Sequence, residues 1–274
     1  NEWGNKNYHT QIYGWYGVVK ENGDIAQLNL HYYNTGGINM DGNIPNTICN
    51  LKALTHLRMN HSKLTGEIPS SIGDLQKLAH LWLFNNQLTG EIPMSAYTIK
   101  TMIEFAVDDN QLEGELPTEI GNWMNMKNLF LGGNNFSGLL PESMSVMTKM
   151  ERLYLANNNF SGPLPEFIGT FTKIWQFDIG NNNFSGNLPS TFKNLHSWYT
   201  YLDNNNFEGE LGDALSGSTN IGYLTLDGNN FSGPIPEYLG DFSELIWLNM
   251  AQNNFTGEIP DTLKNLGNLQ VLAV

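Results

Sequence analysis

The chain has 274 residues, of which 40% are hydrophobic and 15% are charged. No run of about 18 apolar residues occurs, so the sequence predicts no membrane-spanning helix. Its 27 acidic residues against 13 basic ones give a formal net charge of −14, which would repel a phosphate backbone and argues against nucleic acid as a partner.

Residues 1–24 are predicted to form an amino-terminal cap, because a repeat array needs a cover over the open end of its first repeat. Seven apolar side chains could provide this cover: Trp3, Tyr8, Ile12, Tyr13, Trp15, Tyr16 and Val18. The chain begins at Asn1 without a basic and then apolar leader, so a signal peptide was either removed or never present.

The first repeat, from about Ile25, is irregular. Residues 31–37 interrupt its pattern, and we expect them to protrude as a loop. The single cysteine, Cys49, cannot form an intramolecular disulfide and is expected to be a buried thiol.

The following residues repeat one motif, Asn-x-(Leu/Phe)-x-Gly-x-(Ile/Leu)-Pro, at intervals of 24 residues with one interval of 23. Its glycines are Gly66, Gly90, Gly114, Gly138, Gly162, Gly186, Gly209, Gly233 and Gly257. The pattern L-x-x-L-x-L precedes each motif and predicts a short strand with inward apolar side chains. Because one repeat cannot bury its own apolar face, neighbours must stack, and residues 25–274 are predicted to be an α/β solenoid of about ten repeats.

Each recurring position has a physical role. The asparagines after the strand are expected to turn inward and bond backbone groups of the bend, forming a ladder from repeat to repeat. They are Asn86, Asn110, Asn134, Asn158, Asn182, Asn205, Asn229 and Asn253. In the repeat before Asn86, Ser62 occupies this position. The glycine permits a backbone geometry that a Cβ would hinder, and the proline fits the first turn of a short helix.

Two later places depart from the pattern. Around residues 199–203 the repeat is one residue short and Gly212 replaces the proline, which predicts either a kink or bulge, or a functional loop. The last repeat is truncated: residues 269–274 begin a strand with nothing after it, so we expect the native chain to continue or to have been cut there.

These residues resemble the plant-type leucine-rich repeat, L-x-x-L-x-L-x-x-N-x-L-x-G-x-I-P-x-x-I-G-x-L-x-x, which residues 54–77 match almost completely. The resemblance implies a right-handed superhelix with a concave parallel β-sheet, short 3-10 or α segments on the convex side and a second short strand near the Gly-x-Ile segment. The family includes receptor-kinase ectodomains, receptor-like proteins and polygalacturonase-inhibiting proteins, which implies a secreted or cell-surface binding protein. The W-x-G-V of the family's cap is matched by residues 15–18, but Tyr13 and Lys20 stand where its flanking cysteines would fall.

The repeat pattern does not specify the residues at outward positions of the predicted concave strands. Many of these residues are aromatic or charged. Exposed aromatic rows are enriched at recognition surfaces, so they predict a site for a protein, peptide or glycan, centred on Trp82, Phe130, Tyr154 and Trp175. The candidate residues are Arg58, Trp82, Phe84, Phe130, Arg152, Tyr154, Trp175, Asp178, Tyr201, Tyr223 and Trp247. Alternatively, these side chains cover one another as cross-strand neighbours.

No motif for catalysis or cofactor binding occurs, so we expect neither an enzyme nor a cofactor. His56, His80 and Glu104 share one position on successive repeats, which indicates either a metal site or an ordinary polar ladder.

Six asparagines lie in formal N-glycosylation motifs: Asn60, Asn135, Asn159, Asn183, Asn230 and Asn254. Asn135, Asn159 and Asn183 are expected about 5 Å apart, too close for three glycans. Regular rows of Asn and Ser/Thr also suggest an alternative function, adsorption to ice or a polysaccharide. Further alternatives are a structural or adhesive surface protein and an inhibitor of a secreted hydrolase.

Overall fold

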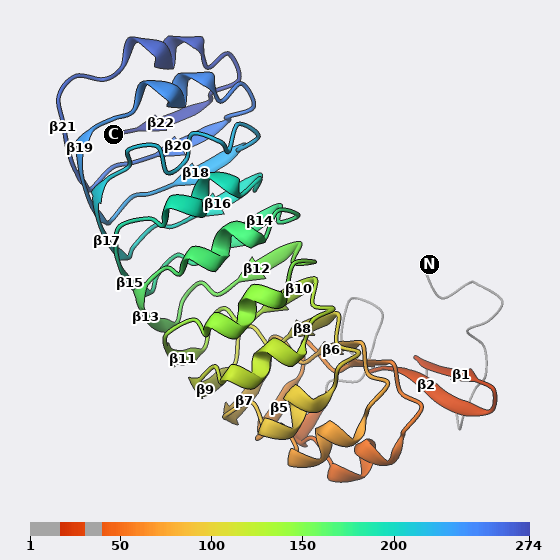
Figure 1. Cartoon of the computed structure of the whole chain (residues 1–274). Coiled ribbons are helices and arrows are strands. Elements are labelled where there is room, and N and C mark those ends of the chain that lie inside the picture. The colour runs from red at the N-terminus through yellow and green to blue at the C-terminus, as the bar shows by residue number, and fades with distance from the viewer. Residues whose placement is uncertain (1–16, 31–39) are drawn as a thin grey trace. The chain divides into compact units, whose positions relative to one another are not determined.

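The computed structural model describes residues 17–30 and 40–274, which belong to two compact units. The first unit comprises residues 1–114 and 119–135, and the second comprises residues 115–118 and 136–274. Within each unit, successive repeats stack with one strand in a main sheet, a bend and a strand in a second sheet, and most repeats add a short helix (Figure 1). The predicted leucine-rich solenoid is confirmed.

The main sheet of each unit carries one strand per repeat. In the first unit its strands are β1 Val18–Glu21, β2 Asp24–Asn29, β4 His56–Arg58, β6 His80–Trp82, β8 Glu104–Ala106 and β10 Asn128–Phe130. In the second they are β12 Arg152–Tyr154, β14 Gln176–Asp178, β16 Tyr199–Tyr201, β18 Tyr223–Thr225, β20 Trp247–Asn249 and β22 Val271–Ala273. The paired strands run parallel within each unit, except that β1 and β2 form an antiparallel pair. The central residue of most strands is buried in the core, which leaves the flanking residues on the opposite face.

The second sheet lies beyond the bend of each repeat. Its strands are β3 Asp41–Asn43, β5 Lys63–Gly66, β7 Gln87–Gly90 and β9 Gln111–Glu115 in the first unit, and β11 Asn135–Gly138, β13 Asn159–Pro163, β15 Asn183–Gly186, β17 Asn206–Glu210, β19 Asn230–Pro234 and β21 Asn254–Thr256 in the second. Its glycines bend the backbone: Gly114 has φ +95°, and a Cβ there would meet Glu91 Cγ at 2.8 Å.

The short helices are all of the 3-10 type and five residues long. They are η2 Asn46–Asn50, η3 Ser70–Asp74, η4 Met94–Thr98, η5 Thr118–Asn122, η6 Glu142–Val146, η7 Glu166–Thr170, η8 Ser190–Asn194, η9 Glu237–Asp241 and η10 Asp261–Asn265. The proline lies one residue earlier than predicted, before the helix: Pro69 is extended (φ −57°, ψ 133°), and its carbonyl accepts a hydrogen bond from Ile72 N–H at 2.9 Å. The proline therefore closes the first turn through its carbonyl.

The asparagine ladder is confirmed within both units. Asn182 Oδ1 accepts a hydrogen bond from Phe160 N–H at 3.0 Å in the preceding repeat, while its Nδ2 donates to the carbonyls of Leu155 and Ile179 at 3.0 and 3.1 Å. Asn110 makes the same contacts in the first unit. Each side chain thus satisfies backbone groups of two repeats that would otherwise be buried without partners.

The interior beside this ladder differs between the units. In the second unit, stacked phenylalanines with ring centroids 6.0 to 6.3 Å apart continue from repeat to repeat. They are Phe136, Phe160, Phe184, Phe207, Phe231 and Phe255. The first unit has buried leucines at this position: Leu64, Leu88 and Leu112.

The short repeat leaves the main sheet regular. Helix η8 follows η7 by 24 positions, whereas β16 follows β14 by 23, so the missing residue lies before β16 and not around residues 199–203. Strand β16 pairs with β14 and β18 in continuous register, and the predicted bulge in the sheet is wrong. The irregularity appears later, where Gly212 replaces the proline and residues 212–217 form turns instead of a 3-10 helix.

At the amino-terminal side, Val18 is buried in β1, as a cap residue should be. The other predicted cap residues, which are Trp3, Tyr8, Ile12, Tyr13, Trp15 and Tyr16, and the predicted loop at residues 31–37 lie outside the described residues. Cys49 is buried, as predicted. Over residues 17–30 and 40–274, no helix has the length and apolar character needed to cross a membrane.

Candidate functional site

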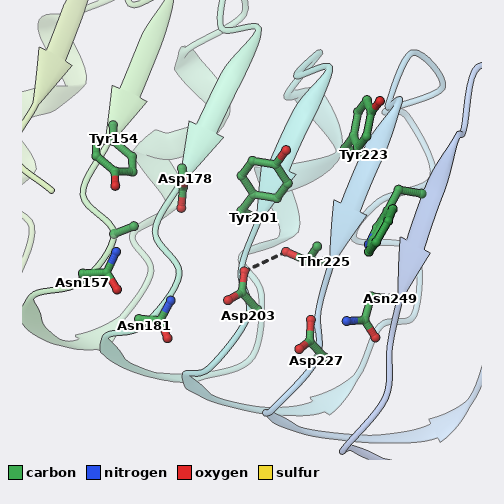
Figure 2. Close-up of a pocket in the computed structure, with 12 residues that line it drawn as sticks. Tyr154, Asn157, Asp178, Asn181, Tyr201, Asp203, Tyr223, Thr225, Asp227 and Asn249 are labelled. Carbon is green, nitrogen blue, oxygen red and sulfur yellow. Dashed lines mark hydrogen bonds between the residues drawn. The ribbon is translucent and has the colours of Figure 1, made fainter. Parts of the chain in front are cut away.

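A shallow groove of about 480 Å³ lies on the face of the second unit's main sheet that points away from the core. Its lining residues are Tyr154, Asp178, Tyr201, Tyr223, Thr225, Trp247 and Asn249 on the strands, and Ala156, Asn157, Asn181, Asp203 and Asp227 just after them. Figure 2 shows the tyrosines standing on the strands, with Asn157, Asn181, Asp203 and Asp227 beyond the strand ends. The groove therefore combines an aromatic side with a polar side.

The parallel register builds this arrangement. Asp178 on β14 pairs with Tyr201 on β16, which pairs with Thr225 on β18. Since neighbouring strands lie about 4.8 Å apart and alternate residues share a face, outward side chains at one position form a continuous row across the sheet.

The aromatic residues in the lining of the groove are Tyr154, Tyr201, Tyr223 and Trp247, and ring contacts continue outside the lining to Tyr199 and Trp175. Tyr199 and Tyr223 stack with centroids 5.1 Å apart and planes at 25°, and Trp175 meets Tyr199 at 6.1 Å. This mutual packing supports the alternative that the rings cover one another. Packing does not remove them from solvent, however, because Trp175 and Trp247 keep 42% and 38% of their surface exposed.

Three carboxylates form the second side. Asp203 is held by two donors. Thr225 Oγ1 donates to its Oδ1 at 2.8 Å (Figure 2), and Asn204 Nδ2 donates to its Oδ2 at 2.9 Å. Asp178 accepts a hydrogen bond from Gly180 N–H at 3.2 Å. Among the described residues that line the groove, none is lysine, arginine or histidine, so no basic side chain of the lining balances these charges.

Burial and neighbouring acidic groups raise the pKa values of Asp178, Tyr201 and Asp227. Burial, with a smaller contribution from the charge of Asp203, raises the pKa of Asp178 to about 7 against the opposing hydrogen bond from Gly180. Burial and Asp203 also raise the pKa of Asp227. Burial, with Asp178 next, raises the pKa of Tyr201 to about 12, so its hydroxyl stays neutral.

The predicted recognition residues divide between the units. Tyr154, Asp178, Tyr201, Tyr223 and Trp247 come together in the groove. In the same unit, the Arg152 guanidinium lies 5.6 Å from the ring centroid of Trp175, and neither residue lines the groove.

Four predicted residues belong to the first unit. The Arg58 guanidinium lies 4.2 Å from the Trp82 ring centroid, and its Nη1 donates to Asn29 Oδ1 at 3.1 Å. Phe84 meets Trp82 at 6.2 Å, and Phe130 is half-buried on β10. None of these four residues lines the groove, which therefore does not include Trp82 and Phe130 of the predicted centre.

The first unit also contains the predicted histidine row. The rings of His56 and His80 stack with centroids 4.3 Å apart and planes at 9°, and His80 Nδ1 lies 3.1 Å from Glu104 Oε2. Burial, followed by the charges of His80 and Arg58, lowers the pKa of His56 to about 4. Over the described part of the chain, no three His, Cys, Asp or Glu residues are grouped to hold a metal ion, and the geometry is that of a polar ladder.

The glycosylation motifs do not form one row. Asn60 is only 3% exposed, so its prediction as an acceptor is wrong: a glycan could not be attached to a buried amide. The other five, which are Asn135, Asn159, Asn183, Asn230 and Asn254, are exposed at the starts of their strands.

The register of the second sheet also corrects the predicted crowding. Asn159 pairs with Ser137 and Asn183 with Ser161, because each strand is staggered by two residues. Each of these asparagines therefore lies opposite a serine of the preceding repeat and not opposite the next asparagine.

Five of the twelve lining residues are among the predicted candidates, and seven are not. Of these seven, Thr225 and Asn249 lie on the strands, and Ala156, Asn157, Asn181, Asp203 and Asp227 lie in the bends after them. Asn157 and Asn181 adopt left-handed φ values of 58° and 54° there. A signal was available, because an asparagine directly before the ladder asparagine marks this bend.

The family model described as Leucine Rich Repeat matches residues 53–75, 125–147, 149–171, 173–195, 220–242 and 244–266. No curated protein sequence shows a significant match to this chain.

Solved structures share the fold. The structure named as a TDR receptor is 31% identical, covers 86% of this chain and 41% of its own, and has a TM-score of 0.81. The Arabidopsis receptor kinase HAESA, solved with the peptide hormone IDA and the co-receptor SERK1, is 29% identical, covers 85% of this chain and 47% of its own, and has a TM-score of 0.62. This chain thus spans less than half the length of either chain. A plant ice-binding protein is 21% identical over 90% of this chain and 79% of its own (TM-score 0.61), which bears on the fold alone.

Proposed function

The chain belongs to the leucine-rich repeat family, and from this premise we propose that it is a non-catalytic module that binds an extended peptide or protein segment in the groove of its second unit. The observation that carries the proposal is the row of partly exposed aromatic side chains beside hydrogen-bonding groups on a rigid sheet. Aromatic anchors on a pre-organised surface are typical of binding hot spots, because they bury a large area at low entropic cost.

The dimensions of the groove suit such a segment. Its lining runs from β12 to β20, which is four steps between neighbouring strands. At about 4.8 Å a step the groove is about 19 Å long, and an extended peptide covers this length with about six residues.

The similarity to plant receptor ectodomains supports the same proposal. HAESA is solved with a peptide hormone and a co-receptor, so a protein that shares this fold binds a peptide. We place this chain at the cell surface or outside the cell on that ground, and a peptide or protein is its proposed partner.

The test is selection from a random heptapeptide library displayed on phage, with the whole chain as the target. Peptides selected by the wild type should bind the Tyr223→Ala, Trp247→Ala double variant at least ~30-fold more weakly, as expected for two hot-spot aromatics. Trp82→Ala in the first unit is the matched control and should leave binding unchanged.

Two outcomes would contradict the proposal. One is a selection that yields no peptide sensitive to the double variant while that variant keeps the wild-type urea denaturation midpoint. The other is thermal hysteresis without peptide binding, which would favour adsorption to ice.

A further inference from the structure

We infer that the groove selects a ligand with a cationic side chain, a guanidinium or ammonium group that sits against Asp178, Asp203 and Asp227 and beside the rings of Tyr201 and Tyr223. This inference rests on the proposed function, because it specifies which peptide the groove binds.

The described residues of the groove lining include acidic residues and no basic residue. Its charged lining residues are Asp178 at the end of β14, Asp203 after β16 and Asp227 after β18, and they come from three consecutive repeats. No lysine, arginine or histidine occurs among the groove residues described. All three carboxylates are only partly exposed, so their charges interact more strongly than they would in bulk water.

The carboxylate of Asp203 is fixed in place by hydrogen bonds. Thr225 and Asn204 each donate a hydrogen bond to a different oxygen of Asp203, and Thr225 itself lines the groove. These donors orient the carboxylate without neutralising it. Each oxygen keeps a lone pair, and a guanidinium can bond two such acceptors at once.

The carboxylates of the groove repel one another. The charge of Asp203 raises the pKa of both Asp178 and Asp227, in addition to the effect of burial. A neutral ligand such as a sugar would leave this repulsion in place. A cation would remove it, so charge complementarity favours a basic peptide over a glycan.

At two other places in the chain, an arginine already lies near an aromatic ring. Arg58 lies over Trp82 in the first unit, and Arg152 lies near Trp175 in the second. The groove has aromatic rings of the same kind next to carboxylates, but its lining has no basic side chain. Arginine suits this setting best, because its planar group both stacks on rings and pairs with carboxylates.

The same phage selection tests the inference with different variants. Selected peptides should be enriched in arginine or lysine. Replacing that arginine by neutral citrulline in a synthetic peptide should weaken binding at least ~10-fold, measured by calorimetry, and so should Asp203→Asn. Asp241→Asn removes a carboxylate on η9, outside the groove, and should change binding less than ~2-fold.

A pH series gives a second readout. The cation binds the ionised groove, and Asp178 has a pKa of about 7, so affinity should rise between pH 6 and pH 8. The groups that face Asp178 are Tyr154 on β12, Tyr201 on β16, Asp203 and the Gly180 amide. Tyr201, with a pKa of about 12, stays neutral over this range.

The outcomes separate this inference from the proposed function. Peptides that depend on Tyr223 and Trp247 but show no excess of basic residues, and that tolerate Asp203→Asn, would overturn the cationic ligand and leave the peptide-binding groove intact. A selection with no aromatic-dependent peptide would overturn both. Basic peptides lost in Asp203→Asn and unaffected by Asp241→Asn would support both.

Discussion

The two units use one framework with different interiors and different faces. Beside the asparagine ladder the first unit packs leucines such as Leu88, whereas the second stacks phenylalanines such as Phe184, and both are fully buried. The ladder and the strand register are the same around either residue. The solenoid thus accepts either side chain in the interior, provided that every repeat of a unit agrees with its neighbours.

The faces differ more than the interiors. In the first unit, His80 pairs with Glu104 and Arg58 lies over Trp82. In the second unit, Asp178 and its neighbours collect in a groove whose lining has no basic residue. We expect binding to occur where charges on a face are left without a counter-charge, and four predictions test the comparison of the two units.

The largest expected effect is in the phenylalanine stack. Phe184→Ala should lower the free energy of unfolding by about 3–5 kcal/mol, because it leaves a cavity between Phe160 and Phe207 in a close-packed interior. Leu88→Ala in the first unit should cost slightly less, about 2–4 kcal/mol, since fewer atoms are lost. Urea denaturation measures both. Equal and small losses, below about 1 kcal/mol, would show that neither interior is tightly packed.

The asparagine ladder should matter equally in both units. Asn182→Ala removes the partners of Phe160 N–H and of two carbonyls, and it should cost about 2–3 kcal/mol. Asn183→Ala, at the adjacent exposed position, should cost less than about 0.5 kcal/mol. Similar losses for the two neighbours in urea denaturation would contradict the ladder's role.

The acidic groove should reduce stability at neutral pH. Because the folded pKa of Asp178 is raised from 3.8 to about 7, the folded state holds this proton more tightly than the unfolded state does. That contribution to stability is complete below about pH 4 and is lost as the pH rises to 7. Asp178→Asn should therefore stabilise the protein by about 2 kcal/mol at pH 8 and change little at pH 4.

Thermal unfolding across this pH range measures the effect, with Asp241→Asn as the control. If the Asp178→Asn variant is less stable than the wild type at pH 8, the ionised carboxylate does not destabilise the folded state.

The smallest effect is expected on the face of the first unit. Arg58→Ala should cost about 0.5–1 kcal/mol of stability through loss of the contact with Trp82. It should not change the affinity for selected peptides, because neither Arg58 nor Trp82 lines the groove. Weaker peptide binding by this variant would show that both faces take part in recognition.

Several features of the fold were predictable from the sequence because they recur at a fixed interval. The 24-residue spacing places Asn182 and its equivalents after each strand, and the structure confirms their inward hydrogen bonds. The same spacing predicted that Tyr154, Tyr201 and Tyr223 share the outward face, and all three line the groove. The single shortened interval was visible too, although its position and the predicted bulge were wrong.

The sequence by itself determined the repeat, the inward framework and the alternation of faces, since these depend on spacing along the chain. Only the tertiary structure decided which charges meet, that Asn60 is buried and that Asn159 lies beside Ser137. These facts depend on the lateral register between repeats and on the local packing of each side chain. A 24-residue period does not specify the two-residue stagger of the second sheet or the absence of a basic residue from the groove.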